Sequence, residues 1–149
     1  MKMKGDYMTQ NDIASFSKKV ARLMYLSTIL WVLVICFQFI IGLVTLIFGY
    51  GIITLAIMIY NIIAVIRYTK NIKIIKNVNS LEGALNMIKY FEDSIWVCIL
   101  FMIINAVLGG VVGFIGNFYD LMLALYVKSK KKDFMIEELL SEEVTYEEL

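Results

Sequence analysis

Two long apolar stretches, each bounded by polar and basic residues, dominate the pattern of the chain. The first runs from Leu23 to Ile66 without a charged residue, and the second runs from Ser94 to Val127 with Asp120 as its one charge. A helix that crosses a membrane needs about 20 apolar residues, so the first stretch is long enough for two crossings. The pattern therefore predicts an all-α integral membrane protein.

The first stretch has a natural break at 48–51, where the sequence reads Phe-Gly-Tyr-Gly. Two glycines supply the backbone freedom that a tight turn requires, and aromatic residues favour the membrane interface. We therefore expect a first transmembrane hairpin over residues 23–68. The second stretch is long for one crossing and short for two, so its topology has to be inferred from charge.

Basic residues flank both stretches, at Lys18, Lys19 and Arg22, at Arg67, Lys70, Lys73 and Lys76, and at Lys128, Lys130, Lys131 and Lys132. Because the positive-inside rule places such clusters in the cytoplasm, each stretch should cross the membrane an even number of times. We expect a second hairpin over residues 93–127 that turns near Leu108-Gly109-Gly110, either spanning or dipping in and returning. The sequence thus predicts four transmembrane helices in two hairpins, with both termini cytoplasmic.

Three further segments are expected in the cytoplasm: residues 1–22, 69–92 and 128–149. The first is an amphipathic segment with Thr9 or Asn11 as its helix cap, and it should lie along the inner membrane surface. The second is a basic loop in which the motif at 79–82, Asn-Ser-Leu-Glu, starts a helix that continues into the third crossing. The third is a tail, basic and then acidic, that is either simply solvated, docks a basic cytoplasmic partner or folds back on the basic cluster at residues 128–132.

The composition narrows the classes of function. Hydrophobic residues make up 60% of the chain, above the roughly 45–50% of ordinary globular proteins. The net charge is +1, so no polycationic surface indicates a nucleic-acid partner. Histidine is absent, Cys36 and Cys98 lack metal-site spacing, and no phosphate-binding or nucleophile motif occurs. We therefore expect no enzyme activity, no metal and no cofactor.

Asp120 is the strongest candidate for a functional residue. It lies eight residues before Lys128, which places it roughly 12 Å below the inner membrane boundary. A carboxylate at that depth is costly unless it is paired, hydrated or protonated, and such residues often mark ion or proton paths. Arg67 is its expected partner, and Asn61, at similar depth, is an expected hydrogen-bond donor. The set either pins the hairpins together or forms part of a conducting path.

Other polar and small residues in the second stretch suit contacts between helices. Asn105 and Asn117 should lie on opposite arms of the second hairpin, where side-chain hydrogen bonds hold membrane helices together. Gly109, Gly113 and Gly116 fall on one helical face, unless Gly109 and Gly110 form the turn, in which case only Gly113 and Gly116 share that face. Glycine faces let two helix backbones approach closely, either within the chain or between copies of it.

These features favour a small non-enzymatic membrane protein that acts through helix packing and partner binding, as an accessory, regulatory or immunity-type subunit. The alternative is a homo-oligomeric, holin-like pore or a small transporter with Asp120 in its path. The abundance of Ile, Lys and Asn is typical of an AT-rich bacterial genome, so we expect a multi-pass protein of the bacterial cytoplasmic membrane. The expected partners are the lipid bilayer and another membrane protein or a second copy of the chain.

Overall fold

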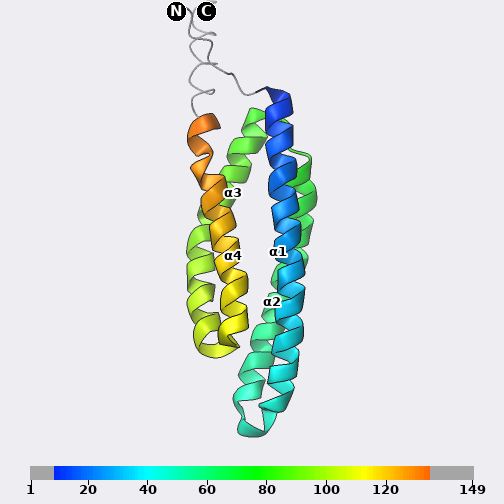
Figure 1. Cartoon of the computed structure of the whole chain (residues 1–149), viewed down its shortest axis with the longest axis vertical. Coiled ribbons are helices and arrows are strands. Elements are labelled where there is room, and N and C mark those ends of the chain that lie inside the picture. Colours follow the sequence, from blue (N-terminus) through cyan, green and yellow to red (C-terminus); the bar gives the residue numbers. More distant parts are fainter. Residues whose placement is uncertain (1–8, 135–149) are drawn as a thin grey trace, which may run out of the picture.

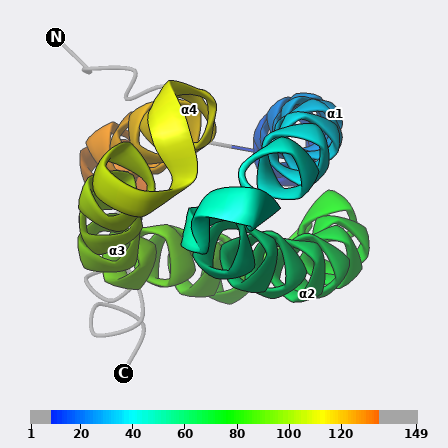
Figure 2. The same cartoon turned by 90° about the horizontal axis from the view of Figure 1, so that it is seen from below.

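The computed structural model describes residues 9–134, and in this part of the chain four long helices form a bundle without any strand (Figure 1). The helices are α1 (Gln10–Val44), α2 (Tyr50–Lys76), α3 (Leu81–Ile104) and α4 (Gly110–Ser129). Figure 2 shows α2 beside α1, α3 beside α4, and α1 next to α4 across the two hairpins. The all-α prediction is confirmed for this part, whereas the acidic part of the tail, from residue 135 onward, lies outside the described residues.

Both hairpins break where the sequence predicts. A 3-10 turn, η1 (Leu46–Phe48), leads into Gly49, whose φ of 75° lies in the left-handed region that favours glycine. Gly51 is needed for a different reason, since a Cβ atom there would collide with the carbonyl oxygen of Gly42 and the backbone of Leu46. The second hairpin turns through η2 (Asn105–Gly109), a π-helical turn that ends where α4 begins.

The predicted amphipathic N-terminal segment forms the first part of a longer helix. α1 begins after Thr9 and continues without a break into the first apolar stretch. Thr9 and Asp12 exchange hydrogen bonds in a capping box, and the bonds from Thr9 hold the pKa of Asp12 below its usual range. The apolar side of this segment belongs to a core that includes residues of α2, α3 and α4, and Ser17 donates a hydrogen bond to the Val78 carbonyl at 2.8 Å, so the segment packs against protein.

The predicted helix after the basic loop is confirmed. α3 starts after Ser80, whose side chain accepts a hydrogen bond from the backbone N–H of Gly83 at 3.2 Å. The helix then runs through Asp93 into the second apolar stretch without interruption. As a result both α1 and α3 project well beyond the apolar stretches at the same end of the bundle (Figure 1).

The buried side of α1 is a single stripe whose members recur at steps of three or four residues. Its buried residues, apart from Ala21, are Ile13, Ser17, Val20, Met24, Ser27, Trp31, Val34, Gln38 and Gly42. This spacing keeps one face of a long helix against its neighbours, as in coiled coils. The stripe changes along its length, because it is mostly apolar near the N-terminus and contains polar or small residues further on.

The apolar core lies at the end of the bundle that holds the described termini. It contains residues of all four helices and Phe134, which is fully buried and lies against the ring of Phe16 with centroids 5.4 Å apart. Its members are Ile13, Val20, Ala21, Met24, Ile72, Ile75, Ala84, Met87, Ile88, Phe91, Leu123, Ala124, Val127 and Phe134. Most of this core therefore comes from segments beside the apolar stretches, as expected where water drives apolar side chains inward.

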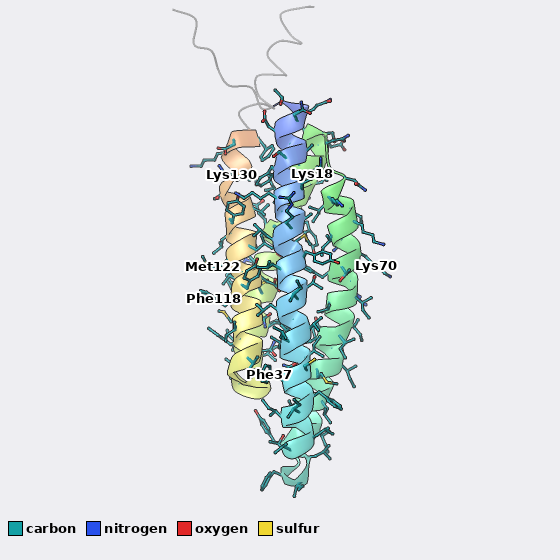
Figure 3. The ribbon with its side chains drawn as sticks, turned by 45° about the vertical axis from the view of Figure 1, so that its right-hand side comes forward. Lys18, Phe37, Lys70, Phe118, Met122 and Lys130 are labelled. Carbon is teal, nitrogen blue, oxygen red and sulfur yellow. The ribbon has the colours of Figure 1, made fainter. Side chains whose placement is uncertain are left out.

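In the apolar stretches themselves, many apolar side chains are exposed and several polar ones are buried. By length and composition α1 and α2 could each cross a membrane, yet only 28% and 17% of their most apolar windows are buried. Phe37, Phe118 and Met122 are about half exposed, and Figure 3 places them away from the end that carries Lys18 and Lys130. Polar side chains such as Gln38 are buried instead.

The second hairpin is shorter than the first. Gln38 donates a hydrogen bond to Asn105 at 3.3 Å, which places the turn of the second hairpin level with Gln38. α1 continues from there to Val44, about 9 Å further along its axis. The tip of the α1–α2 hairpin accordingly extends past the α3–α4 hairpin (Figure 1).

Replacing Gly51 by Ala tests the close approach in the first hairpin. Helix propensity alone would favour Ala by about 1 kcal/mol, whereas the collision with backbone atoms predicts a loss of about 1–3 kcal/mol. Thermal unfolding in detergent micelles, followed by circular dichroism, measures the difference. The control is Ile52→Ala at the exposed neighbouring position; a Gly51→Ala protein as stable as the parent would contradict the packing described here.

Candidate functional site

Asp120 joins the two hairpins. Its Oδ2 accepts a hydrogen bond from the indole Nε1 of Trp31 at 2.7 Å, and its Oδ1 accepts one from the hydroxyl of Ser27. Ser27 and Trp31 are both buried and lie one turn apart on the stripe of α1. The carboxylate on α4 is therefore held by two neutral donors on α1.

The predicted pairing of Asp120 with Arg67 is wrong. Within residues 9–134 the ion pairs join Lys128 and Lys131 to Glu92 and Lys130 to Asp133. Arg67 lies on an exposed part of α2, whereas α4 packs directly on α1. The donors nearest to the carboxylate consequently come from α1, so opposite charge did not determine its partners.

A second polar contact lies further along α1. Asn61 on α2 donates from Nδ2 to Oε1 of Gln38 at 2.9 Å, and Gln38 donates from Nε2 to Oδ1 of Asn105 at 3.3 Å. All three side chains are buried. The expected hydrogen bond from Asn61 to Asp120 is therefore replaced by one to Gln38, and the resulting chain of amides connects α1, α2 and the turn of the second hairpin.

Asn105 and Asn117 also bond to the backbone of the second hairpin. Asn117 on α4 donates to the carbonyl of Phe101 on α3 at 3.3 Å and to that of Gly113 at 3.0 Å. Asn105 donates to the same Phe101 carbonyl at 3.0 Å. The prediction that these two residues hold the arms of the hairpin together is confirmed for the Asn117–Phe101 contact.

The glycines of α4 face the interior of the chain. A Cβ atom on Gly113 would lie 2.6 Å from Oδ1 of Asn105, and one on Gly116 would lie 3.1 Å from ring atoms of Trp31. These two positions therefore support packing within the chain. Gly109 belongs to η2 and not to α4, which agrees with the alternative in which Gly109 forms the turn and only Gly113 and Gly116 share the helical face.

A cavity of about 270 Å³ lies between α2 and α3, with residues of α1 and α4 behind it. Two contacts between α2 and α3 lie at its ends. The rings of Tyr60 and Phe101 stack with centroids 4.7 Å apart, and Asn71 donates a hydrogen bond to the Tyr90 hydroxyl at 3.0 Å. The lining residues fall between these contacts, with Trp31, Asn117 and Asp120 added from the other two helices.

The cavity is lined by three residues that the sequence groups together, although they do not bond to one another. Asp120, Asn61 and Arg67 all line it. Tyr68 lines it as well, and its hydroxyl is buried without a hydrogen-bond partner among the described residues. The sequence offers no signal for Tyr68, since a tyrosine near the end of a membrane helix is an ordinary interface residue.

Within the described residues, no group of three or more carboxylate or thiol side chains gathers as a metal site would require. Comparison of the chain with family models, with curated proteins and with solved structures finds no match. The chemistry of the site therefore has to be inferred from its own residues.

The amide chain predicts the effect of replacing Gln38 by Leu. The donor of Asn61 and the acceptor of Asn105 would remain buried without partners, which should lower the free energy of unfolding by about 1–2 kcal/mol. Phe37→Leu at the exposed neighbouring position is the matched control. Thermal unfolding in micelles measures both variants.

Combining Gln38→Leu with Asn61→Leu tests the same contact independently. Because residues in contact show coupled effects, the double variant should lose less stability than the sum of the two single losses. Strictly additive losses would show that the two amides do not depend on each other.

Proposed function

We propose that the chain is a multi-pass protein of a bacterial cytoplasmic membrane that acts by binding a partner, as a non-enzymatic accessory, regulatory or immunity-type subunit. The observation that supports this proposal most is that, in the apolar stretches, apolar side chains are exposed and polar side chains are buried. Their outer surfaces are apolar, while Gln38, Asn61 and Asn105 are paired inside. A lipid environment favours this arrangement, because lipid covers apolar side chains but cannot satisfy polar ones.

In this proposal the first hairpin crosses the bilayer and the second enters from the cytoplasmic side without reaching the far surface. A helix that runs from Trp96, near the start of the second apolar stretch, to Gly109 at the turn is about 20 Å long. The hydrocarbon core of a bilayer is about 30 Å thick. The second hairpin also ends level with Gln38, before the first hairpin turns. The lysines at the end that holds the described termini, such as Lys18 and Lys130 (Figure 3), favour a cytoplasmic location for that end.

The polar contacts support a binding role over conduction. Ser27 and Trp31 bond to Asp120, and Gln38 bonds to Asn61 and Asn105. These side chains use their hydrogen-bonding groups to join helices, so they stabilise the bundle. A conducting path would instead need polar groups that face a continuous water-filled space.

The cytoplasmic end is the surface we assign to partner binding. Glu92 on α3 accepts from Lys131 at 2.8 Å and lies 3.9 Å from Lys128. Phe134 is buried in the apolar core. These contacts hold the residues directly before the acidic tail against α3 and the apolar core. In this proposal the tail sequence, from residue 135 onward, is therefore attached at the cytoplasmic end of the bundle.

The second candidate function is a homo-oligomeric pore or a small transporter. The observation that favours it is the cavity between α2 and α3, because a carboxylate and an arginine, Asp120 and Arg67, both line it. In this alternative Asp120 interacts with the permeant species.

Cysteine labelling tests the proposed membrane arrangement. In a parent protein with Cys36 and Cys98 replaced by Ser, single cysteines at Lys18, Phe48 and Val107 report on three levels of the bundle. We expect a membrane-impermeant maleimide to label the Phe48→Cys protein in intact cells and the Lys18→Cys protein only after permeabilisation. The Val107→Cys protein should react slowly in both conditions, because the second turn lies within the bilayer.

The labelling results can contradict the arrangement in two ways. Labelling of the Lys18→Cys protein in intact cells would reverse the orientation. Rapid labelling of the Val107→Cys protein from outside would show that the second hairpin also spans the membrane.

Removal of the tail tests the binding role. A stop after Phe134 keeps this core residue in place and removes residues 135–149. Affinity purification of the full chain after crosslinking should recover a specific membrane partner in stoichiometric amount, and the shortened chain should lose it at an equal membrane level. A chain whose tail is replaced by Gly and Ser residues of the same number is the matched control and should also lose the partner.

Retention of the same partner by the shortened chain would contradict the role of the tail. Induction of the full chain should also leave the membrane potential of the cells unchanged. A depolarisation that the Asp120→Asn variant abolishes at equal expression would contradict the binding role and favour the pore.

A further inference from the structure

The cavity between α2 and α3 contains the carboxyl group of Asp120, which has no basic partner among the described residues. Asp120 accepts hydrogen bonds from Ser27 and Trp31, which are both neutral. A carboxylate has about four acceptor sites, so these two bonds leave acceptor capacity on its oxygens. Within residues 9–134 no lysine or arginine forms an ion pair with Asp120. A ligand that carries a positive charge would supply the missing partner.

The walls of the cavity suit such a ligand. Aromatic residues of three helices line it: Trp31, Tyr60, Tyr68, Tyr90, Phe91 and Phe101. Aromatic faces attract cations through their quadrupoles, and the same rings cover an apolar body when it leaves water. The hydroxyl of Tyr68, buried and unpaired among the described residues, adds a hydrogen-bonding group to this lining.

Arg67 marks the exposed side of the cavity. It lines the cavity from an exposed position on α2 and forms no ion pair within the described part of the chain. An arginine side chain at a membrane surface can extend toward lipid phosphates. Asp120 on α4 and Arg67 at its exposed position on α2 thus line the same cavity without forming an ion pair with each other.

We propose that this cavity binds an ammonium group attached to an apolar body, with Asp120 as the counter-charge and the aromatic rings around the apolar part. The ligand is either a free lipophilic amine or the headgroup of an aminophospholipid, whose phosphate would lie near Arg67. This inference rests on the membrane placement proposed above and names the ligand class of the same cavity.

The fluorescence of Trp31 can report binding directly. The chain has two tryptophans, and Trp96 is 77% exposed and does not line the cavity. The full chain carrying Trp96→Phe, purified in a non-ionic detergent, leaves Trp31 as the reporter. Three probes share a phenylalkyl body and carry a positive, a neutral or a negative polar group: phenylbutylammonium, phenylbutanol and phenylbutanoate. We expect saturable binding of the ammonium ion and at least about tenfold weaker binding of the other two.

Substitution of the carboxylate provides the second measurement. Asp120→Asn should weaken binding of phenylbutylammonium by about tenfold or more. Asp93→Asn, an identical change of charge at an exposed position on α3 outside the cavity, should leave it unchanged. The three probes on the protein with intact Asp120 test charge selection even where Asp120→Asn impairs folding.

Nanodiscs of two compositions distinguish the sources of the ammonium group. If phosphatidylethanolamine added to phosphatidylglycerol discs weakens phenylbutylammonium binding, the headgroup of an aminophospholipid occupies the cavity. If binding is the same in both compositions, the ligand is a free lipophilic amine. Both results support an ammonium site.

Equal binding of the ammonium ion and the alcohol, or preferential binding of the carboxylate, would overturn this inference. These probe titrations use purified protein and no partner, so they fail independently of the proposed function. Partner loss on tail removal together with unselective probes would overturn only the ligand assignment. Charge-selective probe binding without a partner would instead overturn only the binding role of the tail.

Discussion

The contact of Asp120 with Ser27 and Trp31 fixes how the two hairpins fit together, and the remaining interior contacts depend on that fit. It aligns α4 with α1, which brings Gly116 against the Trp31 ring. With the hairpins so aligned, Gln38 meets the turn of the second hairpin at Asn105. The same alignment places Asp120 behind α2 and α3, where it lines the cavity. A carboxylate at this position thus serves both the packing of the bundle and the chemistry of the cavity.

The buried stripe of α1 changes in character along its length. Near the N-terminus the stripe contributes Ile13, Val20 and Met24 to an apolar core, where water provides the driving force. Further along it contributes Trp31 and Gln38, which form hydrogen bonds to other helices while the outer faces are apolar. In lipid the driving force between helices comes from close packing and hydrogen bonds. The change along the stripe therefore matches the proposed passage from cytoplasm into membrane.

Most of the residues that mark the site could be found from the sequence, but their partners could not. Asn61, Asn105 and Asp120 stand out because polar groups in an apolar run are costly and need a reason. Arg67 was the partner suggested by opposite charge, yet the partners are Ser27 and Trp31, whose residue types are unremarkable in an apolar helix. Which donor meets a carboxylate depends on the rotation of each helix about its axis and on which helices are neighbours, and one sequence specifies neither quantity locally.

The sequence by itself determined the all-α class, the turns of the two hairpins and the start of a helix within residues 79–82, because hydropathy, glycine conformation and capping are properties of short segments. It also identified the polar residues that the interior must accommodate. Only the tertiary structure decided that α1 is one continuous helix packed against the other three helices, that Gln38 connects Asn61 to Asn105, and that a cavity forms between α2 and α3. These features arise from contacts between residues far apart in the chain, and such contacts exist only once the helices have packed.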